Sequence, residues 1–449
     1  MGGGARPGDD GRDARGARGL SETVRQLPEE QLPVSPSTLE RYRILQKAGG
    51  LVAPLLTVVL AFLISGVVVL LTTGSVVDTA KTYKGIFDGT GLDWFFHVGS
   101  YQIGVPFTSA RVWFPWNTND ISSQAAANLE QTLLLWTALV LVGLAVAFAF
   151  RCGLFNIGGQ GQYLAGSIAA VLVATELPHV VDLPGVLLLL VSVLGGMLAG
   201  AALAGIAGIL KGTVGAHEVI TTIMLNWIVI WVGSYLFDVG GPLQTKAAGA
   251  AGAVPASTDI PDKAQIHVFW GDPLFQGLDV GFFVAIASLV VYYLTLNRTT
   301  LGYEVRAVGH NPEAARYGGI GVARNYFLAM AIAGTFAGLA GALDLLGWKF
   351  RDDITDIQSS SIGFIGIAVA LLGRNTAIGV GLAALLFAAL QTGTASRSLD
   401  PSIFPPELAS SLAVIIQGLV VLFVGADVII LLALGWLRRR RPQKAATAT

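Results

Sequence analysis

The chain has 449 residues, of which 53% are hydrophobic and only 13% are charged, and its formal net charge at pH 7 is −1. About a quarter of the residues in soluble domains are charged, so lipid must replace water over much of this protein's surface. The small net charge excludes a large basic field and, with it, a nucleic-acid partner. We therefore expect an all-α integral membrane protein, because a helix satisfies its own backbone groups in lipid.

Residues 1–50 are rich in Gly, Arg, Asp, Glu and Pro and contain no apolar run. A segment of this composition cannot bury enough apolar surface to fold alone, which predicts a disordered cytoplasmic tail. The first apolar stretch begins at Leu51, too late and too long for a cleaved signal sequence. Residues 51–437 then form one polytopic membrane domain, and residues 438–449 form a basic cytoplasmic tail.

A spanning helix needs about 20 apolar residues. Ten segments are candidates: 51–73, 129–150, 155–177, 185–210, 218–237, 278–296, 326–347, 361–373, 376–394 and 409–437. The segment 361–373 is short, and Asp427 interrupts the last segment. We predict about ten transmembrane helices.

Basic residues give the orientation, because Lys and Arg concentrate in cytoplasmic loops. Arg41, Arg43 and Lys47 precede the first span, which places the N-terminus in the cytoplasm. Alternation then places the following basic residues inside as well: Arg151, Lys211, Arg298, Arg306, Arg316, Arg324, Arg374 and Arg438–Arg441. Both termini are therefore predicted to be cytoplasmic.

The predicted extracytoplasmic loop 74–128 is rich in aromatic residues. Aromatic side chains concentrate at membrane interfaces. Two interpretations remain open: a cap on which a soluble delivery protein docks, or a plain interfacial anchor.

The cytoplasmic loop 298–324 contains a short predicted helix. Asn311 is a good N-cap, Pro312 suits the first helical position, and Glu313 lies where the helix dipole favours an anion. Ala314, Ala315, Arg316 and Tyr317 continue the helix until Gly318 and Gly319 end it. A helix of roughly two turns is marginal alone, so it packs either on this chain or, as we favour, in a groove of a partner subunit.

The chain shows no phosphate-binding loop with the spacing G-x-x-x-x-G-K-[ST]. The nearest text, GILKGTVG at 208–215, has the wrong spacing. The chain's five histidines are not paired with any metal-binding or nucleophile pattern either, so we expect no catalytic residue, no cofactor and no metal site in this chain. If ATP drives its function, a separate subunit hydrolyses the ATP.

Polar side chains interrupt the apolar pattern after Phe150, where Asn156, Gln160 and Gln162 occur among glycines. Such residues at membrane depth either line a solute path, which we favour, or form hydrogen bonds at a tight helix crossing. Asn226 is a weaker candidate for the path. Asp344 either binds a hydroxyl-bearing substrate or, as we favour, pairs with a neighbouring base, Lys349 or Arg351.

Five blocks follow one another along the chain: GLFNIGGQGQ (Gly153–Gln162), KGTVGAHEVITTIMLNWI (Lys211–Ile228), LGYEVRAVGHNPEAARYGGI (Leu301–Ile320), GIAVALLGRN (Gly366–Asn375) and VIIQGLVVLF (Val414–Phe423). Together they resemble the nucleoside and simple-sugar permeases of ATP-binding-cassette (ABC) importers, within the branched-chain amino acid and sugar permease superfamily. The resemblance covers about residues 128–425. Gln160 replaces a Glu that is usual in this family, and Ile365 replaces an Asp or Thr, which leaves the exact substrate open.

The resemblance implies a multi-pass permease of the cell membrane that imports nucleosides or, second, simple sugars. It implies that the short helix is a coupling helix seated on a cytoplasmic ABC ATPase, with the residues Gly309, Asn311, Pro312, Glu313, Ala314, Ala315, Arg316 and Gly318. It also implies a second homologous permease subunit and an extracytoplasmic substrate-binding lipoprotein. The alternatives are an ABC importer permease for another small polar solute, such as a sugar or a branched-chain amino acid, and a stand-alone secondary transporter or channel. The last is disfavoured because the carboxylates inside the predicted spans, such as Asp344 and Asp427, lie near span ends and not in mid-span.

Overall fold

The computed structural model describes residues 36–92, 102–104, 111–113, 121–245, 254–270, 277–395 and 406–425. The chain divides into two units, Met1–Ala53 and Pro54–Thr449. Helix α2 (Pro36–Thr73) belongs to both units. The composition predicts disorder throughout residues 1–50, whereas residues 36–50 are helical. The reason is local: Pro36 suits a first helical turn, and the Leu, Glu, Arg, Gln and Lys residues that follow are good helix formers. Residues 1–35, Asp427 and the basic tail lie outside the described residues.

The second unit is built from helices, as the composition predicts. After α2 the helices are α3 (Val76–Gly89), α4 (Ile121–Arg151), α5 (Gly159–Glu176), α6 (Gly185–Val214), α7 (Glu218–Phe237), α8 (Gly281–Arg298), α9 (Thr300–His310), α10 (Pro312–Tyr317), α11 (Val322–Asp344), α12 (Ile354–Ser359), α13 (Ile362–Leu372), α14 (Ala377–Gly393) and α15 (Pro406–Gly425). A π-helix, η5 (Leu345–Lys349), continues α11. Two short antiparallel strand pairs join β1 (Gln102–Gly104) to β2 (Arg111–Trp113) and β3 (Val268–Trp270) to β4 (Leu278–Asp279).

Seven helices in the described part of the chain are long and apolar enough to cross a membrane. They cover 54–73, 125–151, 185–214, 218–237, 281–298, 322–349 and 354–372. The other three predicted segments correspond to α5, whose first turn is polar, and to α14 and α15, whose apolar parts are shorter. The predicted short segment 361–373 is extended by α12 to Ile354–Leu372. The count of about ten spans therefore stays a prediction.

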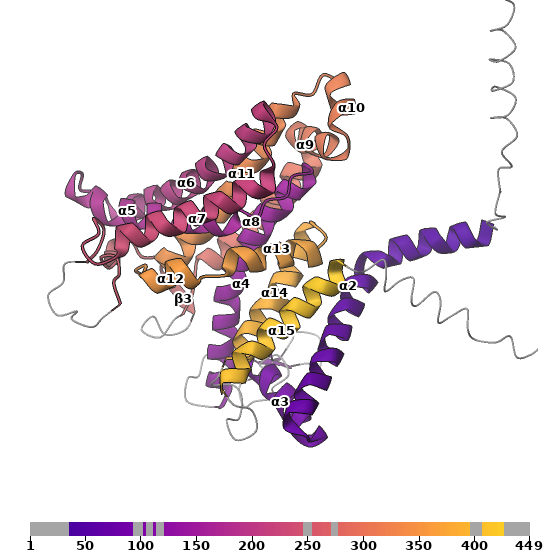
Figure 1. Ribbon diagram of the computed structural model, residues 1–449. Helices are drawn as coiled ribbons and strands as arrows, with labels where there is room; N and C mark the ends of the chain where they lie inside the picture. Colours follow the sequence, from indigo (N-terminus) through magenta and orange to yellow (C-terminus); the bar gives the residue numbers. More distant parts are fainter. Residues whose placement is uncertain are drawn as a thin grey trace, which may run out of the picture. The chain divides into compact units, whose positions relative to one another are not determined.

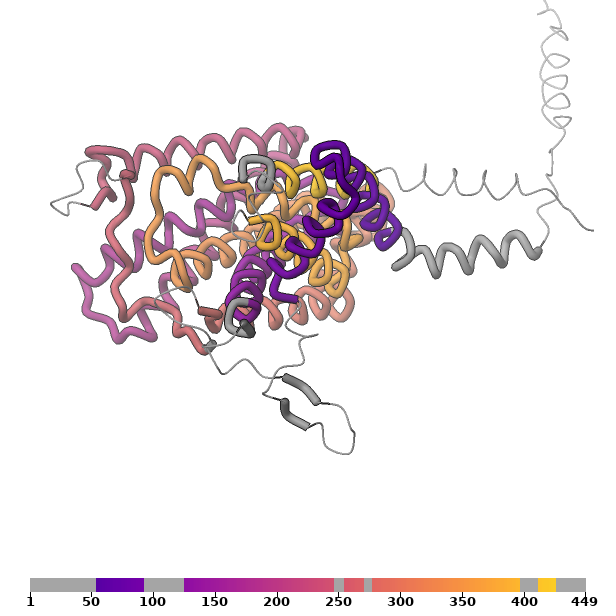
Figure 2. The backbone as a smooth tube through the Cα atoms, turned by 90° about the horizontal axis from the view of Figure 1, so that it is seen from below, coloured from indigo at the N-terminus to yellow at the C-terminus, as the bar shows by residue number. Residues whose placement is uncertain are grey.

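Of the seven long apolar helices in the described part, α4 and α11 are the most deeply buried. Figure 1 and Figure 2 show the bundle from two directions. Helix α11 packs against α6, α5 and α4, while α4 packs in turn against α13, α14 and α8. Every residue of α4 from Trp136 to Ala149 is buried. A helix that is apolar on all sides and buried on all sides is what a core position in such a bundle requires.

Glycines let α6 and α11 approach closely. A Cβ on Gly200 would lie 2.3 Å from the carbonyl oxygen of Gly334, and a Cβ on Gly338 would lie 2.2 Å from that of Gly196. Helix association within lipid depends on such close packing of small residues. The spacing of four between each pair on its own helix therefore reflects one contact surface.

The loops that the charge pattern assigns to the cytoplasm meet at one end of the bundle. The guanidinium group of Arg151 donates from two nitrogens to the carbonyl oxygen of Asn375, at 3.0 and 2.8 Å. Helices α9 and α10 pack on each other at the same end, where Gly309 contacts Arg151. The charge pattern and the fold thus group the same loops, and which end faces the cytoplasm stays a prediction.

We predict that Gly200→Ala destabilises the protein by about 1–3 kcal/mol, because the added methyl group meets a backbone oxygen that cannot rotate away. The apparent melting temperature of the detergent-solubilised protein measures this effect. Gly418→Ala is the matched control, because a Cβ at this glycine of α15 meets no atom within 4 Å. Equal melting temperatures for the two variants would contradict the tight α6–α11 contact.

Candidate functional site

Helix α5 begins on a pair of amide side chains. Asn156 is fully buried and lies in the irregular turn before α5. Its Nδ2 donates to Oε1 of Gln162 at 3.0 Å, and Nε2 of Gln162 donates back to its Oδ1 at 2.9 Å. The same Oδ1 also accepts from the backbone N–H of Gly158 at 2.9 Å. This reciprocal pair holds the turn that leads from α4 into α5.

Helix α7 supplies a third amide, Asn226, to the same place. Its Oδ1 accepts from the N–H of Gly161 at 2.8 Å, and its Nδ2 donates to the carbonyl oxygen of Ile157 at 2.9 Å. A Cβ on Gly161 would lie 2.8 Å from Oδ1 of Asn226, so glycine is required for this contact. Asn226 thereby satisfies two backbone groups that the irregular start of α5 leaves without a helical partner.

Gln160 completes this group and joins it to α13. Its Oε1 accepts from the N–H of Gly363 at 2.8 Å, and a Cβ on Gly363 would lie 2.2 Å from the Gln160 Cα. Its Nε2 is buried and has no hydrogen-bond partner among the described residues. This free donor distinguishes Gln160 from Asn156, Gln162 and Asn226.

We call Asn156, Gln160, Gln162 and Asn226 the amide cluster. The four residues were predicted as path residues from their polarity, and the structure brings them together at the crossing of α5, α7 and α13. In this conformation most of their polar atoms bond to one another or to the backbone, which is the second interpretation of the sequence pattern. Their role in a solute path stays a prediction.

Asp344, the fifth predicted path residue, lies apart from the amide cluster in a second polar group. Its Oδ2 lies 3.1 Å from Nζ of Lys349, which confirms the pairing favoured from the sequence. Its Oδ1 accepts from Nε1 of Trp348 at 2.5 Å, and its Oδ2 also accepts from the hydroxyl of Tyr163. Asp344 thus receives three donors, from α5 and η5.

Three members of this second group were missed by sequence reasoning: Tyr163, Ser167 and Asp352. Ser167 on α5 donates to Asp352, whose carboxyl is buried in the turn after η5. Burial raises the pKa of Asp352 to about 6, while the nearby charge of Lys349 acts in the opposite direction. We call Tyr163, Ser167, Asp344, Lys349 and Asp352 the outer network. One signal existed in the sequence, since Gln160, Tyr163 and Ser167 share one face of α5 at helical spacing.

The predicted coupling helix is present as α10, a helix of six residues. The side chain of Asn311 accepts from the N–H of Ala314 at 3.0 Å, Pro312 is the first helical residue, and Gly318 is the C-cap. Gly319 follows at φ +82°, a conformation that favours glycine. The predicted start and end of this helix are therefore confirmed.

The two sides of α10 differ in exposure. Ala315 is buried against this chain, whereas Glu313, Ala314 and Arg316 are exposed. Tyr317 is 93% exposed and was not singled out from the sequence. The Arg316–Glu313 pair at 3.5 Å is exposed on both partners and contributes little to stability. The exposed side is therefore an unpartnered surface in the described part of the chain.

Gly309, near the end of α9, contacts the turn that precedes α5. A Cβ on Gly309 would lie 2.3 Å from the carbonyl oxygen of Arg151 and 3.0 Å from the nitrogen of Gly153. Gly153 itself has φ +74° and opens the turn that contains Asn156. Helix α9, on which α10 packs, therefore touches through backbone contact the turn on which the amide cluster is built.

A phosphate-binding loop at 208–215 is excluded by the fold, since α6 continues to Val214.

Comparison with known proteins adds to this geometry. The family described as the branched-chain amino acid transport system permease component matches residues 128–425, the range of the resemblance noted above. The nucleoside ABC transporter permease protein NupB of Lactococcus lactis subsp. cremoris is 35% identical over 320 residues, which cover 70% of this chain and 84% of the relative. The guanosine ABC transporter permease protein NupP of Bacillus subtilis is 36% identical over 318 residues, which cover 69% and 84%. The glucose ABC transporter permease protein TsgB13 of Haloferax volcanii is 36% identical over 303 residues, which cover 66% and 75%. No solved structure matches the chain.

We predict that Asn226→Leu destabilises the fold by at least about 1–3 kcal/mol, because it leaves the N–H of Gly161 and the carbonyl of Ile157 buried without partners. The apparent melting temperature of the purified protein measures this loss. Ser192→Ala is the control, because this buried serine of α6 bonds only within its own helix, to Leu188. An Asn226→Leu variant as stable as Ser192→Ala would show that the α5–α7 bonds are dispensable.

Proposed function

Since the chain belongs to the permease-component family of the branched-chain amino acid transport system, we propose that it is the membrane-spanning subunit of an ATP-driven importer that carries nucleosides. It is a multi-pass protein of the cell membrane, with seven long apolar helices in its described part. The observation that carries the proposed cargo is the likeness to two permeases named for nucleosides and guanosine, each matched over 84% of its length. The glucose permease relative makes simple sugars the second candidate.

The chemistry of the amide cluster supports a nucleoside cargo. An amide presents a donor and an acceptor side by side, and the edges of nucleobases present the same combination. Nε2 of Gln160 has no hydrogen-bond partner among the described residues, so it can donate to a solute. The hydrogen bond between Asn156 and Gln162 can be replaced by bonds from each amide to a solute. We propose the amide cluster as the point where the solute path crosses α5.

We propose that the exposed side of α10 binds the ATPase subunit. A six-residue helix is too short to be stable alone, and here the Asn311 cap and the burial of Ala315 fix its position. Its outer side offers Glu313, Ala314 and Tyr317, and exposed aromatic anchors are typical of binding hot spots. Of the residues expected at this interface, we leave out Ala315, which is buried within the chain, and Gly309, which packs on Arg151 and Gly153.

Movement of α10 has a direct route to the solute path. Helices α10 and α9 pack on each other, Gly309 of α9 rests on Arg151 and Gly153, and the turn after Gly153 carries Asn156. The contact of Gly309 with Arg151 and Gly153 is between backbone atoms, so no side chain that could change its rotamer lies in that step. We propose that this series transmits ATP-driven motion to the amide cluster.

The remaining partners of the proposed importer are a second homologous permease subunit and an extracytoplasmic substrate-binding lipoprotein. Residues 93–101, 105–110 and 114–120 of the aromatic loop 74–128, on which such a lipoprotein would dock, lie outside the described residues. The second subunit and the lipoprotein are therefore proposed from family membership alone.

Uptake of tritiated adenosine tests the proposed cargo in a host that lacks its own nucleoside importers and expresses this chain with its ATPase, second permease and lipoprotein. We predict ATP-dependent uptake that unlabelled nucleosides inhibit and glucose does not. Gln160→Met should lower uptake about tenfold or more, because the solute loses one buried hydrogen bond.

Gln417→Met is the matched control for this substitution, since Gln417 on α15 also has a buried Nε2 without a partner among the described residues. Its uptake should equal that of the unaltered chain. Inhibition by glucose and not by nucleosides would show that the cargo is a simple sugar. Equal uptake by both variants would show that Gln160 does not line the path.

The docking role of α10 is tested by Ala314→Lys, which places a long cation on the exposed side without disturbing Ala315. We predict normal amounts of the protein in the membrane, loss of ATPase co-purification and a fall in uptake of about tenfold or more. Thr258→Lys adds the same charge at an exposed position in the segment between α7 and α8 and should change neither readout. Full ATPase association in Ala314→Lys would place the motor on another surface.

A further inference from the structure

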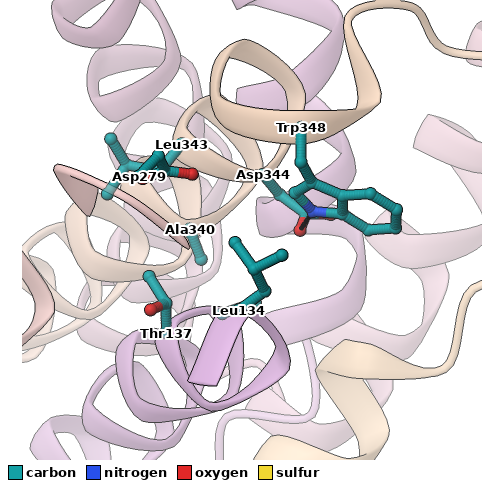
Figure 3. A pocket seen from close by; sticks show the side chains of 8 residues that line it. Leu134, Thr137, Asp279, Ala340, Leu343, Asp344 and Trp348 are labelled. Atoms are coloured by element: carbon teal, nitrogen blue, oxygen red, sulfur yellow. Dashed lines mark hydrogen bonds between the residues drawn. The ribbon is translucent and has the colours of Figure 1, made fainter. Parts of the chain in front are cut away.

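A small cavity of about 10 Å³ lies between α4, α11 and the start of α8, and it holds about one water molecule (Figure 3). Two buried carboxyl groups line it, those of Asp279 and Asp344, which are 4% and 7% exposed. The remaining lining residues are mainly apolar: Leu134, Thr137, Ala138, Ala340, Leu343 and Trp348. The proposed amide cluster does not include any of them.

The cavity offers hydrogen-bond acceptors and hardly any free donors. The indole N–H of Trp348 is already given to Asp344 at 2.5 Å, and the hydroxyl of Thr137 donates to the carbonyl oxygen of Leu133 at 3.0 Å. Oδ1 of Asp279 accepts from the N–H of Gly281 at 2.5 Å. Its Oδ2 is not among the fully enclosed polar atoms that lack a partner in the described part of the chain, so this oxygen can accept a hydrogen bond from a solute hydroxyl group.

Two glycines keep Asp279 in this position. A Cβ on Gly281 would lie 2.6 Å from its Oδ1, and a Cβ on Gly347 would lie 2.1 Å from its Oδ2. Burial, reinforced by the neighbouring charge of Asp344, raises the pKa of Asp279 to about 6, and the N–H of Gly281 acts against this rise. The acid is therefore built into the packing of the β4–α8 turn against η5.

We propose that this cavity is the outer solute subsite, which accepts the sugar hydroxyls of a neutral solute and rejects phosphorylated forms of the same solute. Hydroxyl groups supply donors for Asp279, and Leu134, Leu343 and the Trp348 ring supply apolar surface for the carbon face of a sugar. A phosphate would meet two carboxylates and no free cation, because Lys349 is not among the lining residues and pairs with Asp344. The subsite rests on the proposed function and adds a selectivity to it.

The cavity also has a physical link to the amide cluster. Tyr163 lies one turn after Gln160 on α5, and its hydroxyl donates to Asp344 at the cavity edge. A volume of one water cannot admit a sugar, so the subsite is closed in this conformation. The segment able to open it is η5, because π-helical turns are frequent at functional sites and η5 ends on Phe350 at φ +56°.

Thiol labelling of Thr137→Cys tests the subsite. The chain has one native cysteine, Cys152, which is 1% exposed and whose thiol pKa burial raises to about 12, and Cys152→Ser removes it from the background. The permease with its ATPase is placed in nanodiscs and labelled with a maleimide with and without ATP. We expect ATP to accelerate labelling of the Thr137→Cys thiol, and adenosine at about ten times its dissociation constant to slow it about tenfold.

Adenosine 5′-monophosphate at the same concentration should give no protection. The matched control is Leu135→Cys, two positions earlier on α4. Leu135 does not line the cavity, so neither solute should protect a cysteine there. Three results would overturn the subsite: no labelling of Thr137→Cys during turnover, equal protection of both positions, or equal protection by the phosphorylated solute. The proposed function fails separately, through absent adenosine uptake by the unaltered importer.

Discussion

Helix α5 carries polar side chains through a bundle that offers them no water, and the neighbouring helices are arranged to satisfy them. Asn226 of α7 serves the backbone of the first turn, the N–H of Gly363 from α13 serves Gln160, and Asn156 and Gln162 serve each other. Glycines at 161 and 363 exist because these bonds require the helix backbones to approach so closely. An unsatisfied polar group at this depth costs several kcal/mol, so this set of bonds fixes which helices surround α5.

The same helix connects the two ends of the molecule. Its entry turn contacts Gly309 of α9, on which α10 packs. Further along α5, Tyr163 and Ser167 bond to Asp344 and Asp352 of the outer network. A shift of α5 would therefore act on the amide cluster and on the cavity beside Asp344 together. This arrangement is suited to alternating access, in which one end must close while the other opens.

Local features were predictable from the sequence and long-range pairings were not. The Asn311 cap, Pro312 and the two closing glycines define α10 within nine residues, and the Asp344–Lys349 pair spans only five positions. The polarity of the amide cluster was visible, but its bonds were not, because Asn226 is 65 positions from Gly161. Ser167 and Asp352 are 185 positions apart, and Asp279 meets Gly347 only through the packing of β4 on η5. The residues that sequence reasoning missed are thus those whose partners come from distant segments.

In the proposed importer, α10 binds the ATPase, and the solute crosses the membrane beside the amide cluster of α5. A cryo-electron microscopy structure of the importer, assembled with its ATPase and bound to adenosine, tests both parts in one measurement. We predict that the exposed side of α10, with Tyr317, contacts the ATPase and that adenosine lies within hydrogen-bonding distance of Gln160 or Asn226. An ATPase seated on another loop, or adenosine bound away from α5, would contradict it.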